Sequence, residues 1–214
     1  MVRRIVWMSA VALIAAQAVA GAQYPRNPRT QIPTSNYYVG LSYGLYELGT
    51  LDDGKTGNEW SFGYTTQLAA TLEKTLSGGG SIGILAGFAS PRLTYRPIGT
   101  FDPTCCTAKA DVTQLLATAR LGGGFYGLRS SLVIDAGATQ FANFHDAASD
   151  LKLTGGGAWD PTFGTGYELG VALTPKTDVY FSFSFLFVLH DQGDAVSTTP
   201  PFNHTMKIGV RQGF

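Results

Sequence analysis

The segment V-Y-F-S-F-S-F-L-F-V-L-H, residues 179–190, alternates between two kinds of side chain. One parity carries Phe181, Phe183, Phe185 and Phe187, and the other carries Tyr180, Ser182 and Ser184. Because successive side chains of a β-strand point to opposite faces, this segment has a wall of phenylalanine and a wall of hydroxyls. A soluble protein would bury the phenylalanine wall in its core, whereas a membrane barrel would turn it to lipid.

The first residues have the layout of a secretory signal peptide. Arg3 and Arg4 precede an apolar run over residues 5–16, and small residues suited to cleavage follow. The run is shorter than the ~20 residues that a spanning helix needs. The expected organisation is a signal peptide over residues 1–22, an extended proline-containing lead-in over 23–35 and one domain over 36–214.

Eight segments alternate in this way, and turn residues separate them. Most are 12–15 residues long, whereas soluble strands usually have ~5–6 residues and ~9–11 suffice to cross a bilayer at a tilt. The connections after the second, fourth and sixth segments are short, and the others are mostly longer and more polar. The expected strands are 36–48, 58–72, 82–89, 108–121, 128–142, 159–173, 179–190 and 202–214.

Two details of these segments are specific enough to check. In the second segment, Trp60 and Phe62 are expected on the same apolar face as Tyr64. In the third, the alternation loses its phase near Pro91, which predicts a bulge or the end of the strand there.

The composition indicates which face of the predicted strands contacts water and which contacts lipid. Charged residues make up 14% of the chain, against ~25% in soluble domains. In a lipocalin-like soluble barrel, the aromatic residues would crowd a narrow interior and the outside would lack charge. With the large residues facing lipid, the small ones fill the lumen. Closure of the sheet into a barrel then gives every backbone N–H and C=O group a hydrogen-bond partner on a neighbouring strand. We therefore expect an all-β protein, an eight-stranded antiparallel up-and-down transmembrane β-barrel; a soluble lipocalin-like binder is the alternative.

The C-terminus adds a specific resemblance. The ending M-K-I-G-V-R-Q-G-F resembles the assembly signal of Gram-negative outer-membrane β-barrels, although Gln212 departs from its apolar rule. The turn L-T-P, before K-T-D-V-Y-F, resembles a periplasmic turn of the small outer-membrane protein A/W-like barrels. The resemblance implies a monomer in the cell outer membrane, with outer-membrane lipids and the barrel assembly machinery as partners. The residues of the signal are Met206, Ile208, Val210 and Phe214.

Charged residues of inward parity are candidates for a site in the lumen. They are Asp135, Glu168 and Lys207 near mid-strand, and Arg120, Arg129 and Arg211 nearer the periplasmic ends. Because buried charges must pair, we hypothesise that Lys207 pairs with Glu168, Asp135 or both. Such a cluster is either a structural plug or, as the resemblance suggests, a gate over a narrow ion path. If Lys207→Met changed neither stability nor conductance, both interpretations would fail.

Other chemistry finds little support in the sequence. None of His145, His190 and His204 is followed two positions later by serine, as in the H-x-S arrangement of the barrel deacylases, so we assign no catalytic residue, metal or cofactor. A formal net charge of zero gives no indication of a nucleic-acid partner. Cys105 and Cys106 are adjacent, and the sequence does not decide whether they form a vicinal disulfide or remain two loop thiols.

The function expected from these observations is a non-enzymatic one. The barrel would have a structural role in the envelope and present four surface loops. A narrow ion or small-solute pore and a lipid-modifying outer-membrane enzyme are the alternatives, because the fold alone does not decide between them.

The closed barrel predicts a simple electrophoretic result. The detergent-refolded mature chain should remain compact in SDS until it is heated, because its strands are paired all round. Boiled and unboiled samples should therefore migrate differently on a gel. Equal migration, with a protein that is soluble without detergent, would mean that the two faces are assigned the wrong way round.

Overall fold

The computed structural model describes residues 35–54, 57–76, 79–96, 106–125, 128–174, 176–190 and 202–214. The predicted signal peptide and residues 23–34 of the lead-in lie outside these ranges. Within the described part of the chain, no helix is long and apolar enough to cross a membrane. The strands are β1 (Tyr37–Glu47), β2 (Thr50–Asp53), β3 (Asn58–Phe62), β4 (Tyr64–Thr75), β5 (Ser81–Ala89), β6 (Arg92–Arg96), β7 (Thr107–Phe125), β8 (Leu128–Asp146), β9 (Trp159–Thr174), β10 (Thr177–Val188) and β11 (Phe202–Gly213).

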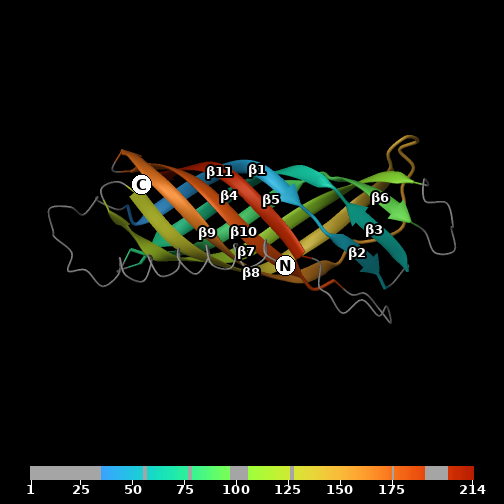
Figure 1. The fold of residues 1–214 in the computed structure, drawn as a ribbon, viewed down its shortest axis with the longest axis horizontal. Helices are drawn as coiled ribbons and strands as arrows, with labels where there is room; N and C mark the ends of the chain where they lie inside the picture. The colour runs from blue at the N-terminus through green and yellow to red at the C-terminus, as the bar shows by residue number, and fades with distance from the viewer. Residues whose placement is uncertain are drawn as a thin grey trace, which may run out of the picture.

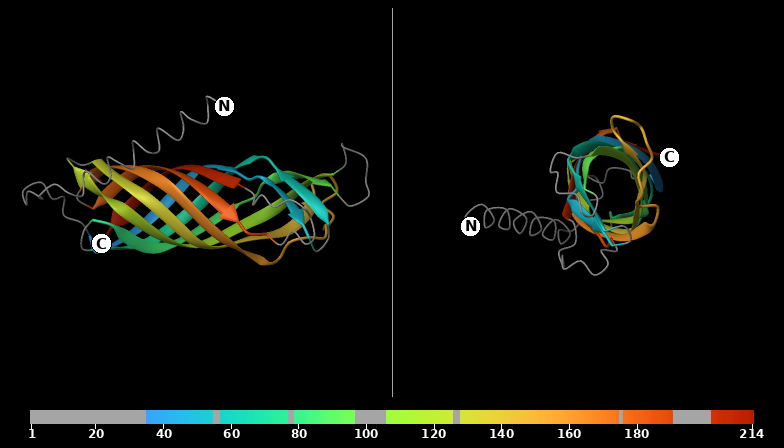
Figure 2. Two further views of the ribbon diagram at one scale, coloured as in Figure 1. Left: turned by 60° about the horizontal axis from the view of Figure 1, so that its bottom comes forward. Right: turned by 90° about the vertical axis from the view of Figure 1, so that its right-hand side faces the viewer.

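Eight of these strands close into a barrel of antiparallel neighbours. The order around the ring is β1, β4, β5, β7, β8, β9, β10 and β11, and the pairing of β11 with β1 closes it. The view along the barrel axis shows the ring (Figure 2). The end with the short connections β4–β5, β7–β8 and β9–β10 is called the turn end here, and the opposite end is called the loop end (Figure 1).

The two faces of the wall confirm the predicted fold class. In β10, Ser182 and Ser184 are buried in the lumen, whereas Phe181 is 45% exposed on the outside. The residues of the C-terminal signal, Met206, Ile208, Val210 and Phe214, also lie on the outside. At the turn end, the rings of Tyr37 and Phe214 stack with centroids 6.0 Å apart. Large residues outside and small polar ones inside reverse the arrangement of a soluble barrel.

The predicted orientation of Trp60 and Phe62 is wrong. The expected second strand is two strands, β3 and β4, separated at Gly63. Tyr64 is 73% exposed on the outside, but both Trp60 and Phe62 point inwards and are buried. Gly63 belongs to neither strand and changes the phase of the alternation, so that a pattern continuous in sequence switches face in the structure.

Similar interruptions occur in the neighbouring strands. The wall formed by β5 and β6 is interrupted at Ser90 and Pro91, where the sequence predicted a bulge or the end of the strand. In the β7–β8 pair the register shifts between Lys109 and Asp111, opposite a positive φ of 52° at Asn143. Beyond these interruptions, β2, β3, β6 and the ends of β7 and β8 extend the wall at the loop end (Figure 1).

The switch at Gly63 can be tested by fluorescence. Of the three tryptophans of the chain, Trp7 lies in the predicted signal peptide, so that the protein expressed without residues 1–22 contains Trp60 and Trp159. In Trp159→Phe protein refolded into vesicles, the Trp60 emission should be blue-shifted and protected from iodide, because its ring is fully buried. Strong iodide quenching would show that Trp60 faces outwards, as an unbroken strand would place it. In the matched Trp60→Phe variant, the emission comes from Trp159 alone and reports the environment of a side chain that is 48% exposed on the outer wall.

Candidate functional site: the filled lumen

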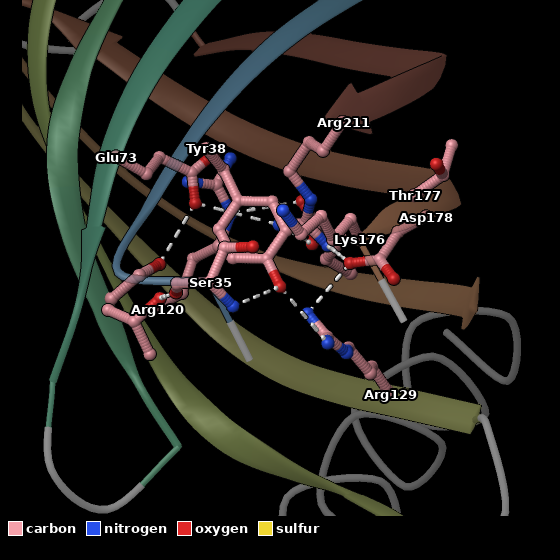
Figure 3. A network of polar contacts seen from close by, with 12 residues as sticks. Ser35, Tyr38, Glu73, Arg120, Arg129, Lys176, Thr177, Asp178 and Arg211 are labelled. Carbon is pink, nitrogen blue, oxygen red and sulfur yellow. Dashed lines mark hydrogen bonds and ion pairs between the residues drawn. The ribbon is translucent and has the colours of Figure 1, made fainter. Parts of the chain in front are cut away.

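A ring of four charges spans the lumen towards the turn end. Arg120 of β7 lies between two carboxylates, with Nη1 3.0 Å from Glu73 Oε1 and Nε 3.0 Å from Glu168 Oε2. Arg211 of β11 completes the ring, with Nη1 2.8 Å from Glu168 Oε1 and 3.6 Å from Glu73 Oε2. All four side chains are buried, and their charges balance. The ring joins β4, β7, β9 and β11 across the barrel, and Figure 3 shows its members Glu73, Arg120 and Arg211.

A second group continues the network to the turn end. Arg129 donates from Nη1 to Asp178 Oδ2 at 2.7 Å, and Nη2 of Arg211 lies 3.7 Å from the same oxygen. The Arg129 guanidinium lies over the ring of Tyr38, 5.6 Å from its centroid, and the backbone amide of Ser35 donates to Tyr38 Oη. Figure 3 shows these side chains together inside the wall. The network therefore fills the lumen down to the turn end of the barrel.

Small residues on the inner wall make room for these long side chains. A Cβ atom at Gly209 would lie 2.5 Å from Cζ of Tyr180, the ring that the guanidinium of Arg211 covers at 4.7 Å. A Cβ atom at Gly40 would lie 3.0 Å from Cγ of Arg211. In an eight-stranded barrel the interior is only just wide enough for side chains, so the ion pairs depend on glycine opposite them.

Lys207 lies above the ring, and its hydrogen bond is to a glutamine amide rather than to one of the predicted carboxylates. Among the described residues, no ion pair within 4.0 Å joins it to Glu168 or Asp135, and its contact is from Nζ to Gln67 Oε1 at 3.5 Å. Both oxygens of Glu168 already pair with arginines. Lys207 and Asp135 line a cavity of about 20 Å³, which is room for about one water molecule.

A column of polar side chains continues from Lys207 towards the loop end. Gln67 donates from Nε2 to Gln114 Oε1 at 2.7 Å, and Gln114 donates to Tyr46 Oη at 2.9 Å and to Thr139 Oγ1 at 3.2 Å. These side chains are all buried. The hydrogen bonds satisfy groups that would otherwise be costly to bury, and they fix the side chains across the lumen.

An apolar cluster fills the lumen at the loop end. Its centre is Trp60, whose ring packs against Phe144 and Phe141 at centroid distances of 4.4 and 6.4 Å. The segment between β8 and β9 folds onto this cluster: Leu153 packs against it, and Tyr95 Oη donates to the carbonyl of Thr154 at 2.9 Å. The loop end is thus closed by side chains of the wall and by a returning segment.

The three histidines lie apart from one another. His190 Nδ1 is 2.6 Å from Asp160 Oδ2, at the edge of the apolar cluster. His204 pairs with Glu47 at 2.9 Å, and His145 forms a β-bridge with Lys152. The described residues contain no group of three side chains placed to hold a metal ion. Cys106 is disulfide-bonded, and Cys105 lies outside the described ranges.

Two residues of the network, Glu73 and Asp178, were not among the predicted site residues. Each lies one residue beyond a predicted strand boundary, at 72 and at 179, whereas β4 and β10 include them. Both have the inward parity of their strands. Extending the alternation by one residue at the turn end would have identified them.

Comparison with solved structures shows the fold. Neisserial surface protein A superposes with a TM-score of 0.56 and 11% identity, covering 84% of this chain and 98% of its own. The outer membrane protein OprG from Pseudomonas aeruginosa gives 0.53 and 10%, covering 86% and 99%. No protein-family model matches the chain, and no curated protein matches it in sequence. The chain has the fold of the small eight-stranded outer-membrane barrels.

Arg120 should be the most costly of these charges to remove. Arg120→Met leaves Glu73 and Glu168 buried with one arginine between them, and should lower the free energy of unfolding by about 3–5 kcal/mol. Denaturant titration in micelles measures the loss. The control is Arg96→Met, because Arg96 forms an exposed pair with Glu59 and should cost about 0–1 kcal/mol. Equal losses in the two variants would show that the ring does not hold the barrel together.

Proposed function

We propose that the mature chain is a non-enzymatic barrel of the cell outer membrane with a closed lumen, which serves the envelope as a structural element. The observation that supports this best is the continuous filling of the interior. The ring at Arg120, the polar column at Gln114 and the apolar cluster at Trp60 follow one another along the axis. The chain would then act through its outer wall and its loop end.

Two seals of different chemistry oppose a pore. At the ring, a passing ion would have to separate buried charges that are compensated by each other, which costs several kcal/mol per unpaired charge. At the loop end it would have to lose its hydration among the aromatic and aliphatic side chains packed around Trp60. Because the seals lie at different heights, a rotamer change at one of them leaves the other closed.

The proposed orientation follows from the two ends. The short connections and the stacked pair of Tyr37 and Phe214 would face the periplasm. The loop end, with β2, β3 and β6, would project outside the cell. In this proposal residues 1–22 direct export as a signal peptide, and residues 36–214 form the barrel domain.

The outer wall also suits the proposed assembly route. Met206, Ile208 and Val210 of β11 and the terminal Phe214 lie on one exposed face. A row of apolar side chains on the last strand is accessible before the barrel closes, as contact with the assembly machinery would require. After closure the same row would face outer-membrane lipids, and the chain would function as a monomer.

Conductance distinguishes the closed barrel from the pore. The refolded mature chain, inserted into planar bilayers, should give no stepwise current, because both seals are in place. Insertion is verified independently by the heat-dependent gel shift of the same vesicles. Reproducible current steps from the unmodified chain would contradict the proposal and favour the narrow ion or small-solute pore.

A further inference from the structure

A strip of basic residues crosses the outside of the barrel near the loop end. Arg92 of β6 is the cross-strand partner of Lys109 in β7, Lys109 is the partner of His145 in β8, and His145 forms a bridge with Lys152. Side chains directly opposite each other in antiparallel strands have Cβ atoms about 4.5–5.5 Å apart. Arg92, Lys109 and Lys152 are exposed. The register therefore brings three permanent cations and one histidine into a single row.

The strip is not neutralised by the carboxylates described near it. None of its three permanent cations forms an ion pair with a described carboxylate. Asp111 accepts hydrogen bonds from Ser90 and Asn143 instead, at 3.2 and 2.9 Å. Asp146 accepts hydrogen bonds from the backbone amides of its own turn and from a serine hydroxyl. Glu59 forms its ion pair with Arg96. Like charges opposite each other destabilise a sheet, so this row suits an anion from outside the chain.

The strip lies just beyond the apolar part of the wall. The row below it includes Phe88 and Trp159, which are 51% and 48% exposed and are the last large apolar residues of β5 and β9 on this side. Arg92 follows Phe88 by four residues, or about 13 Å along the chain. Exposed tryptophan marks the boundary between hydrocarbon and headgroups in membrane barrels. The cations therefore stand at the depth of the headgroups.

We propose that Arg92, Lys109 and Lys152 bind the phosphate groups of lipids in the outer leaflet, with His145 between them in the row. Arginine offers two parallel donors to phosphate, and lysine offers a compact charge. The inference rests on the proposed place of the chain in the outer membrane. A soluble polyanion fits the observations less well, because the strip lies on the side of the barrel next to the apolar wall.

Binding of a phosphorylated lipid tests the assignment. The refolded chain in neutral detergent is titrated with fluorescent diphosphorylated lipid A, and with its dephosphorylated form. We expect binding that requires the phosphates. The variant R92Q/K109Q/K152Q should bind roughly 100-fold more weakly, from about fivefold for each basic residue at an anionic surface.

A matched variant and two soluble competitors separate lipid binding at the strip from general attraction of anions. The variant E59Q/R96Q removes a neighbouring exposed ion pair and should bind like the unmodified chain. Equal binding by R92Q/K109Q/K152Q and the unmodified chain would overturn the proposal. Full competition by inorganic phosphate or by heparin would also overturn it, in favour of a soluble anion. Each variant is first shown to fold by its gel shift, so that failure of the barrel itself is recognised separately.

Discussion

Closure of the sheet is the constraint on which the other features depend. Hydrocarbon offers no hydrogen-bond partner to the backbone, so every amide and carbonyl of the wall must be paired within it. The chain meets this requirement by pairing β11 with β1 and β7 with β8. A ring of eight strands leaves a narrow interior. That width explains why the inner wall is rich in glycine and serine and why a few long side chains are enough to fill it.

The chemistry of the side chains that fill the interior changes along the barrel axis, and within each layer the side chains contact partners of their own kind. At the turn end, two arginines and two glutamates neutralise one another, and every member has partners on two sides. Amide and hydroxyl side chains follow, and then the apolar cluster around Trp60. A lumen closed by three kinds of contact makes the outer wall and the loop end the surfaces through which the chain acts.

The sequence predicted what depends on alternation alone. Within an unbroken strand such as β10, the period of two assigns every side chain to its face, and the phenylalanines were placed correctly. The predicted orientation of Trp60 and Phe62 was wrong because Gly63 interrupts the strand. The apolar residues still alternate with small or polar ones across the interruption, so the sequence pattern does not reveal the change of face. Parity also did not identify the hydrogen bond of Lys207 to Gln67, because it shows that a side chain points inwards but not which of several inward groups lies within hydrogen-bond distance.

Nuclear Overhauser measurements on the refolded chain in lipid nanodiscs test the assignment of the two faces most directly. Methyl groups of Ile84, Ile134 and Ile208 lie on the outer wall, whereas those of Leu85, Leu116 and Val133 lie inside it. We expect cross-peaks to lipid acyl protons from the first three. We expect none from the second three, although they alternate with outward residues on the same strands. Acyl cross-peaks from Leu85 or Val133, or their absence at Ile84 and Ile208, would contradict a barrel with its large residues in lipid.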